Sequence, residues 1–203
     1  RIGDNCSSLE LISDSERNLY AYAWGRNGPG FYRSLDAGMS WTRMPIAAAG
    51  PKGQIAANER GDVVAAVSGP SQQEIHRSGD HGKTWEKVSS PHEFWIEQLA
   101  VANDGTLTVK TMDNLLAPNG GSFISTDGGK SWTRLNDRWT GANGIPGENG
   151  IVTGPSGRLF ARQRIDFQGL PSSWGWGGTI YYSDDSGRSW RAINPLVGKT
   201  PDQ

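Results

Sequence analysis

The sequence of 203 residues has little of what marks several common classes of protein. It has one cysteine, Cys6, so no disulfide can form within the chain. No run of about 18 apolar residues is present, which excludes a hydrophobic membrane-spanning helix. Basic and acidic residues number 20 and 21, giving a formal net charge of -1. This balance argues against a nucleic-acid partner bound through a broad basic surface.

The sequence also lacks the hydrophobic periodicity of an amphipathic helix and the spacing of side chains that bind a metal. The histidines His76, His81 and His92 do not fall at the short intervals that metal sites use, so we expect no metal and no cofactor. What the chain does contain is 28 glycines and 9 tryptophans, among short apolar runs of strand length. This composition predicts an all-β chain with many tight turns.

Two stretches end like a phosphate-binding loop, with Gly-Lys followed by Ser or Thr, at 82–84 and 129–131. Such a loop also needs a glycine five residues before the Gly-Lys pair. Those two positions hold Arg77 and Ile124, and the residues that follow each stretch resemble a strand rather than a helix. The sequence therefore disfavours a nucleotide site, and a repeat explains both stretches better.

Four stretches share the pattern Ser-x-Asp-x-Gly-x-Ser/Thr-Trp and align without gaps. They are SLDAGMSW at 34–41, SGDHGKTW at 78–85, STDGGKSW at 125–132 and SDDSGRSW at 183–190. Their aspartates are separated by 44, 47 and 58 residues. Intervals of this length are close to one four-stranded propeller blade, so each stretch is predicted to mark one blade.

The residue types of this pattern suit a turn between two antiparallel strands. The carboxylate can accept N–H groups of its own turn, the glycine can take positive φ, and the tryptophan can form an apolar plug at the blade edge. A calcium loop would need further oxygen ligands and a late acidic ligand, which the pattern does not supply. We therefore expect a structural role for eight side chains: Asp36, Asp80, Asp127, Asp185, Trp41, Trp85, Trp132 and Trp190.

The pattern resembles the Asp-box, or BNR repeat, of sialidases, some other propeller glycosidases, sortilin-type receptors and propeller assembly factors of photosystem II. The resemblance implies an all-β fold: a β-propeller of four-stranded antiparallel blades with four Asp-box repeats. We expect a single domain over 1–203, with blades at approximately 9–45, 54–90, 97–136 and 149–195.

Four blades leave the closure of the ring undecided. Three arrangements fit: a closed four-bladed ring, part of a larger propeller, or a ring completed by a second chain in a homodimer. We favour the closed ring, because part of a larger propeller would expose strand edges and apolar blade faces to water.

Five tryptophans lie outside the repeats, and the strand order predicted for each blade places them on the loop face opposite the Asp-boxes: Trp24, Trp95, Trp139, Trp174 and Trp176. Loop tryptophans either hold long loops in place or contact a ligand. Aromatic planes with nearby charges suit a glycan or a peptide. The candidate ligand-binding residues are Trp95, Trp139, Trp174, Trp176, Arg138 and Arg164.

Sialidase activity would need a set of catalytic residues that cannot be assigned to positions in this sequence. The resemblance implies three arginines, a tyrosine nucleophile helped by a glutamate, and an aspartic acid. The chain opens with Arg-Ile-Gly at 1–3, without the proline that usually follows, and has no late blade to supply the nucleophile. A glycosidase with two carboxylates is the remaining catalytic interpretation, with Asp166 paired with Asp137 or Glu148.

The sequence therefore predicts a non-catalytic propeller that binds a glycan or a protein partner through its loop face. The alternative is a sialidase-like or other glycoside hydrolase, diverged or truncated. A third interpretation is an assembly module whose exposed aromatic residues contact another protein. We expect no nucleic-acid partner and no membrane insertion. The family resemblance implies an extracytoplasmic location, secreted or periplasmic.

Overall fold

The computed structural model describes residues 6–25, 28–46, 53–68, 73–91, 95–111, 121–134, 151–153, 158–164, 178–185 and 189–193. Within these ranges every regular element is a β-strand, and sixteen strands form four antiparallel sheets of four. In each sheet the strands pair in chain order, so each sheet is a meander. The predicted all-β fold with four-stranded blades is confirmed.

Each sheet is one blade, and the blades are numbered along the chain. Blade 1 contains β1 (Cys6–Ser13), β2 (Leu19–Gly25), β3 (Gly28–Ser34) and β4 (Thr42–Arg43). Blade 2 contains β5 (Gln54–Ala57), β6 (Val63–Ser68), β7 (Gln73–Ser78) and β8 (Glu86–Val88). Blade 3 contains β9 (Ile96–Val101), β10 (Leu107–Thr111), β11 (Gly121–Ser125) and β12 (Thr133–Arg134). Blade 4 contains β13 (Ile151–Thr153), β14 (Leu159–Arg164), β15 (Gly178–Ser183) and β16 (Arg191–Ile193).

The four blades share one strand register. The first serine of every Asp-box pairs with the first residue of the second strand in its blade: Leu19 with Ser34, Val63 with Ser78, Leu107 with Ser125 and Leu159 with Ser183. A shift by one residue would turn every side chain of a strand to the other face of the sheet, so a shared register makes positions equivalent from blade to blade.

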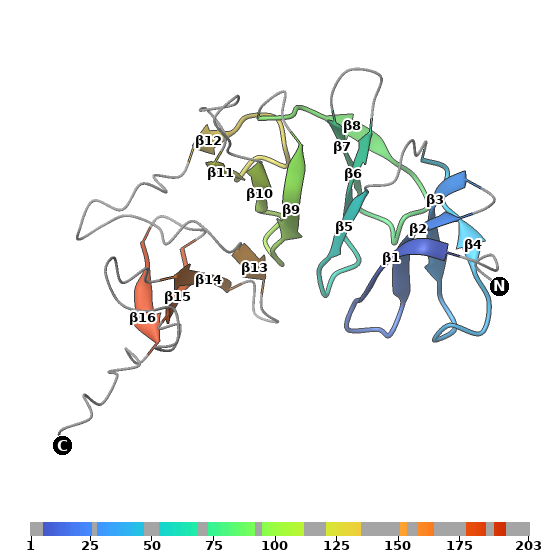
Figure 1. The fold of residues 1–203 in the computed structure, drawn as a ribbon, viewed down its shortest axis with the longest axis horizontal. Coiled ribbons are helices and arrows are strands. Elements are labelled where there is room, and N and C mark those ends of the chain that lie inside the picture. Colours follow the sequence, from blue (N-terminus) through green and yellow to red (C-terminus); the bar gives the residue numbers. More distant parts are fainter. Residues whose placement is uncertain are drawn as a thin grey trace, which may run out of the picture.

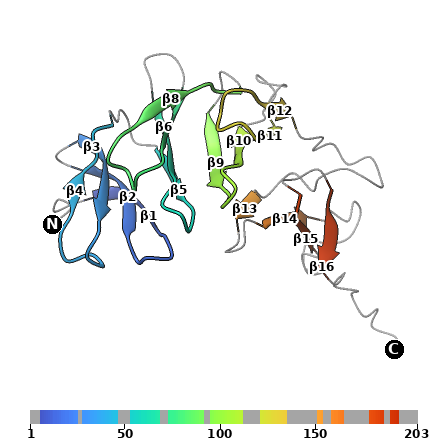
Figure 2. The same cartoon turned by 180° about the vertical axis from the view of Figure 1, so that it is seen from behind.

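The blades follow one another around an open arc (Figures 1 and 2). Their first strands make the contacts along the inside of the arc, from β1 to β5, from β5 to β9 and from β9 to β13. Blades 1 and 4 lie at opposite ends of the arc. The closed four-bladed ring that the sequence analysis favoured is therefore wrong, because four blades packed in this way do not bring the first blade to the last.

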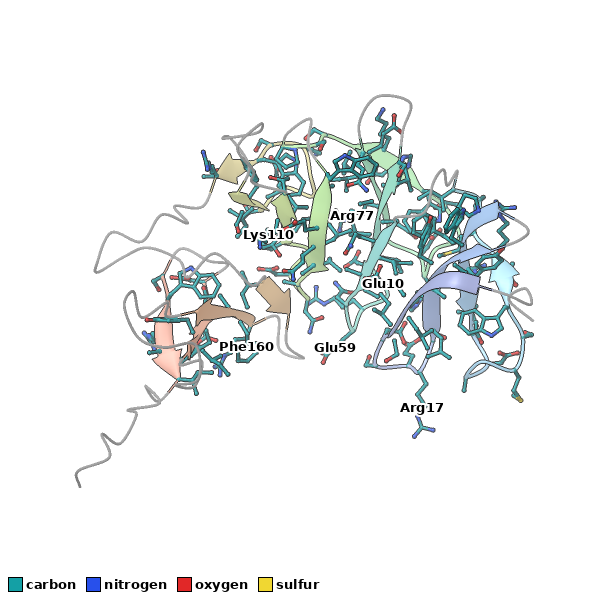
Figure 3. All side chains as sticks on the ribbon, viewed as in Figure 1. Glu10, Arg17, Glu59, Arg77, Lys110 and Phe160 are labelled. Carbon is teal, nitrogen blue, oxygen red and sulfur yellow. The ribbon has the colours of Figure 1, made fainter. Side chains whose placement is uncertain are left out.

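The apolar core is divided into clusters that lie between blades. The largest side chains of the first cluster come from blade 1, and the facing residues from blade 2 are aliphatic: Tyr20, Tyr22, Phe31, Met44, Ile55, Val63, Ala65 and Val67. Side chains fill the spaces between the sheets (Figure 3). At the same junction, Glu10 accepts the N–H of Ile55 at 3.1 Å, and burial raises the pKa of Glu10 to about 6.

The Asp-box tryptophan of each later blade packs against the cluster that it shares with the preceding blade. Trp85 packs against the first cluster, Trp132 against the second and Trp190 against the third. The sequence predicted a plug at the edge of the blade, and the structure shows that the plug joins two blades. In blade 1, Trp41 belongs to none of the clusters formed by the described residues.

Among the described residues, the junction between blades 3 and 4 has the smallest cluster, formed by Ile124, Leu159 and Ala161. The shared register explains this difference. Where blade 1 presents Tyr20 and Phe31 to the next blade, blade 3 presents Thr108 and Ser122 at the equivalent positions. Burial of these small polar side chains removes less apolar surface from water and so contributes less to stability.

We therefore expect blade 4 to open more readily than blade 2. Backbone amides of β14 should exchange with deuterium at least about tenfold faster than those of β6, because a smaller apolar cluster gives a lower free energy of local opening. Native-state hydrogen exchange measured residue by residue checks this prediction. Equal protection of β6 and β14 would contradict it.

Candidate functional site

Two of the residues predicted to bind a ligand lie in the described part of the chain, Trp95 and Arg164. Arg164 ends β14 and pairs with Gly178, five residues along the strand from Leu159, which pairs with the Asp-box serine. It therefore lies at the end of the blade away from the box. The remaining candidates lie outside the described residues: Trp139, Trp174, Trp176, Arg138, Asp137, Glu148 and Asp166.

Trp95 lies directly before β9, and 49% of its surface is exposed. The next residue, Ile96, donates its backbone N–H to the side-chain oxygen of the buried Gln73. Gln73 begins β7, and Ser78 at the other end of β7 begins an Asp-box. The structure thus holds Trp95 beside the end of blade 2 that lies away from the boxes.

Trp24 has a different environment. It lies in β2 and packs, partly buried, against the apolar cluster between blades 1 and 2. Its ring therefore contributes to the core between two blades. Of the tryptophans outside the repeats, Trp95 is the one that the described structure exposes.

The box carboxylates are occupied by hydrogen bonds within their own turns. Asp80 accepts the backbone N–H groups of Lys83 and Thr84, each at 2.9 Å, the Thr84 hydroxyl at 2.7 Å and the Ser78 hydroxyl at 2.7 Å. Asp127 accepts the same set from Lys130, Ser131 and Ser125.

These hydrogen bonds stabilise the ionised form of each box carboxylate. The hydroxyl groups of Ser34 and Ser40 lower the pKa of Asp36 to about 2. The backbone N–H and hydroxyl of Thr84 hold the pKa of Asp80 well below its usual range. An ionised carboxylate that four donors already satisfy cannot supply a proton near neutral pH, so the box aspartates fit a structural role and not general acid catalysis.

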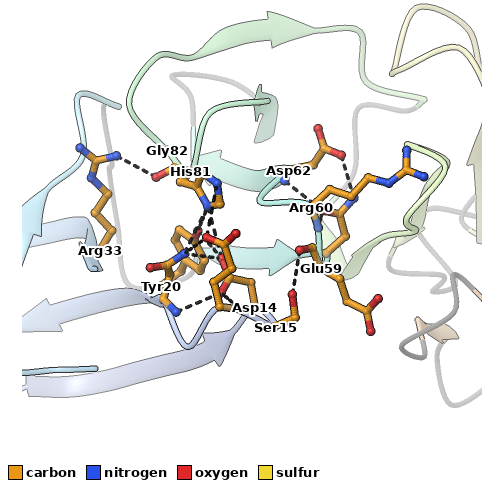
Figure 4. Close-up of polar contacts among 12 residues, drawn as sticks. Asp14, Ser15, Tyr20, Arg33, Glu59, Arg60, Asp62, His81 and Gly82 are labelled. Atoms are coloured by element: carbon orange, nitrogen blue, oxygen red, sulfur yellow. Dashed lines mark hydrogen bonds and ion pairs between the residues drawn. The ribbon is translucent and has the colours of Figure 1, made fainter. Parts of the chain in front are cut away.

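A second polar cluster lies where box 2 meets the first turn of blade 1 (Figure 4). The side chain of Asp14 is fully buried and accepts the N–H groups of Glu16 and Asn18, each at 3.0 Å. It also accepts the Asn18 amide at 2.8 Å and the Tyr20 hydroxyl at 2.9 Å. The Nδ1 atom of His81, from box 2, lies 3.4 Å from the carboxylate.

This cluster contains the residue types of an acid–base site, but its groups are not available to react with a ligand. Burial raises the pKa of Asp14, and the hydrogen bonds from Asn18 and Tyr20 outweigh that effect, so the pKa is lowered overall. Burial, together with the hydrogen bond to Asp14, raises the pKa of Tyr20 far above its usual range. Because these groups already satisfy one another, the cluster joins blade 1 to blade 2 rather than presenting a reactive group.

Two further hydrogen bonds hold the backbone of His81, one from blade 1 and one within blade 2. Arg33 donates to the carbonyl oxygen of His81 at 2.8 Å, and His81 donates its N–H to the carbonyl oxygen of Gly61 at 3.1 Å. His81 has a left-handed backbone with φ of 58°. The box of blade 2 therefore lies against the turns between the first and second strands of blades 1 and 2.

Within the described residues, no group of three or more His, Cys, Asp or Glu side chains is arranged to hold a metal ion. The same residues contain no helix that is long and apolar enough to cross a membrane.

Comparison with known proteins agrees with this architecture. Residues 123–134, which include the third box, match the sequence model of the BNR/Asp-box repeat. Among proteins with curated descriptions, none matches the sequence. The fold is that of a β-propeller, and the four repeats within it are Asp-boxes.

Three solved structures show the likeness in fold. YCF48 from Cyanidioschyzon merolae has a TM-score of 0.51 and 14% identity, over 90% of this chain and 54% of that one. The GH74 xyloglucanase from Xanthomonas campestris has a TM-score of 0.56 and 16% identity, over 94% and 30%. TolB from Acinetobacter baumannii has a TM-score of 0.59 and 11% identity, over 92% and 44%. This chain thus spans about half, or less, of the length of each.

Acid should destabilise the chain through its box carboxylates. Their pKa values in the folded chain lie below that of a free aspartate, so their stabilising effect is complete above about pH 4 and is lost as the pH falls through the folded values. The urea midpoint should fall as the pH is lowered to about 2, and the Asp80→Asn variant should show a weaker dependence.

Glu86→Gln, on the exposed strand β8, is the matched control and should keep the dependence of the unmodified chain. An Asp80→Asn variant whose urea midpoint falls as steeply with acid as that of the unmodified chain would contradict this account of the box.

Proposed function

We propose that this chain is a non-catalytic propeller module that binds a protein partner through the blade end carrying Trp95. The observation that carries the proposal is the half-exposed Trp95, held by the hydrogen bond from Ile96 to Gln73 at the end away from the boxes. Large aromatic side chains with restricted backbones are frequent energetic centres of protein interfaces.

The distribution of polar groups supports binding at this end rather than at the box end. At the box end, the carboxylates Asp14, Asp80 and Asp127 are satisfied by donors within the chain. At the other end, the described candidates are an aromatic residue and Arg164, whose backbone lies at the same end of blade 4. An aromatic residue and a cation suit an extended peptide segment, with a glycan as the second ligand class.

A catalytic function has less support. The three carboxylates predicted for a glycosidase, Asp137, Glu148 and Asp166, lie outside the described residues. The likeness to a xyloglucanase is a likeness of fold at 16% identity. Fold alone does not imply chemistry, so we place the diverged glycosidase second. An extracytoplasmic location is part of the proposal and rests on the family resemblance.

The test is a peptide library and a glycan array screened in parallel with three forms of the chain. The unmodified chain should select peptides, Trp95→Ala should weaken their binding by at least about tenfold, and Met39→Ala should bind normally. Met39 is the control because it is exposed at the tip of box 1, at the opposite end.

Thermal unfolding of each variant shows whether the fold is kept, because Trp95 is half exposed and its removal should cost little stability. Peptide binding that Trp95→Ala leaves unchanged would refute this site. Selection of glycans alone, lost in Trp95→Ala, would replace the protein partner with a glycan.

A further inference from the structure

The junction between blades 1 and 2 contains a carboxyl group that the proposed function does not use. Glu10 lies in the middle of β1 and pairs with Tyr22 of β2. Its Oε2 atom accepts the backbone N–H of Ile55, in β5 of the next blade, at 3.1 Å. Because β1 and β5 are the first strands of their blades, this hydrogen bond joins two sheets along the inside of the arc.

The donor is a backbone group that the sheet of blade 2 does not use. Strand β5 lies at the edge of its sheet and pairs there with β6. Alternate N–H groups along an edge strand point away from the sheet and need a partner from outside it. The N–H of Ile55 has this partner in Glu10. The Glu10 carboxyl group therefore connects one blade to the next.

Apolar groups close around this hydrogen bond. The buried side chains of Tyr22 and Ile55 belong to the apolar cluster between blades 1 and 2. The backbone of Gly53 lies against the ring of Tyr22, and a Cβ atom at that position would lie 2.6 Å from a ring carbon. Burial disfavours the charged form of Glu10 and outweighs the hydrogen bond from Ile55, so the pKa of Glu10 is raised to about 6.

Among the described residues, Glu10 has no cationic partner. Strand β2 places one titratable group beside it, Tyr22, and burial raises the pKa of that phenol, so it stays neutral near pH 7. Strand β5, with the sequence Gln-Ile-Ala-Ala, has no titratable side chain. Asp14 and His81 belong to the same junction, at the turn and box where blade 1 meets blade 2. An ionised Glu10 thus has no opposite charge beside it.

The shared register shows that the equivalent position is neutral in the next two blades. The first-strand partner of the fourth residue of the second strand is Glu10 in blade 1, Gln54 in blade 2 and Gln98 in blade 3. A glutamine side chain offers an oxygen of the same reach but does not titrate. Of these three positions, that of blade 1 alone can gain a charge.

We propose that Glu10 is a pH-sensitive joint between blades 1 and 2, closed while its carboxyl group is protonated and loosened when the group ionises. The neutral carboxyl group keeps an oxygen that can accept the N–H of Ile55. The ionised group has to lose water without gaining a cation, so it favours opening of the junction. This inference is independent of the ligand site at Trp95.

The direction of the effect follows from the raised pKa of Glu10. The folded chain holds this proton more tightly than the unfolded chain does. The contribution of the proton to stability is therefore complete below about pH 4.5 and is lost as the pH rises through about 6. The box carboxylates act in the opposite direction and at lower pH, so the two effects can be measured separately.

Urea unfolding from about pH 5 to about pH 7.5 tests the proposal with the unmodified chain, Glu10→Gln and the control Glu86→Gln. The unfolding equilibrium constant of the unmodified chain, relative to that of Glu10→Gln, should rise about tenfold over this range, since one pKa unit is a factor of ten and solvent screening reduces the full shift. Glu86 is exposed on β8, so Glu86→Gln should follow the unmodified chain. Asp14 and His81 are present in all three forms, so their effects cancel. Parallel curves for the unmodified chain and Glu10→Gln overturn the proposal.

Hydrogen exchange at about pH 7.5 shows where the chain loosens. The amide of Ile55 should exchange about tenfold faster in the unmodified chain than in Glu10→Gln, while the amide of Val109 in blade 3 should exchange equally in both. The two forms are compared at one pH, so the intrinsic exchange rates cancel. Equal acceleration at Val109 would show that Glu10 acts on the whole chain and would overturn a joint at this junction.

A titration of the unmodified chain tests the same point without a variant. The carbon-13 shift of the Glu10 carboxyl group should change with a midpoint at about pH 6. A midpoint at the ordinary value of 4.5 also overturns the proposal.

Discussion

The packing of the Asp-box tryptophans of blades 2, 3 and 4 against the preceding blade is the interaction on which the arrangement of the four sheets depends. The box fixes the position of this ring: the Asp80 carboxylate orders the turn, and the Trp85 indole N–H donates to the carbonyl oxygen of Gly82 at 3.1 Å. The ring then packs against the cluster that blade 1 shares with blade 2. Local hydrogen bonds within blade 2 thereby place an apolar side chain against blade 1. In blade 3 the Trp132 indole N–H donates instead to the carbonyl oxygen of Ser89 in blade 2, at 2.9 Å, and the succession of these contacts gives the arc (Figure 1).

The two ends of the molecule differ in their polar groups, and this difference explains where binding is expected. The box end carries the hydrogen bonds that hold turns together and join blades, as in the cluster of Asp14, Tyr20 and His81 (Figure 4). The carboxylates of Asp14, Asp80 and Asp127 at this end accept hydrogen bonds from donors within the chain. The opposite end, where Trp95 begins blade 3, has a large exposed side chain on an anchored backbone. A scaffold made rigid at one end leaves the other end free to vary for recognition.

Much of the fold could be predicted from the sequence, because the box is a local signal and repeats at blade spacing. The position of Trp95 followed from the strand order within a blade. Closure could not be predicted, because it depends on how adjacent blade faces pack and not on the repeat itself. The contact of His81 with Asp14 was missed, since the two residues are far apart in the chain and only the packing of blade 2 on blade 1 brings them together. Trp24 was placed with the loop tryptophans, and only the structure shows that it packs between blades.

The most direct test of this account compares one substitution in two equivalent boxes. Trp85 and Trp41 make the same indole hydrogen bond within their boxes, at 3.1 Å, but only Trp85 packs against a preceding blade. The free energy of unfolding should be measured with urea for Trp85→Ala and Trp41→Ala, at a concentration where light scattering shows a single chain. The account predicts a loss of about 3 kcal/mol for Trp85→Ala and of about 1 kcal/mol or less for Trp41→Ala. Equal losses would show that the tryptophan acts within its own blade and would contradict the account.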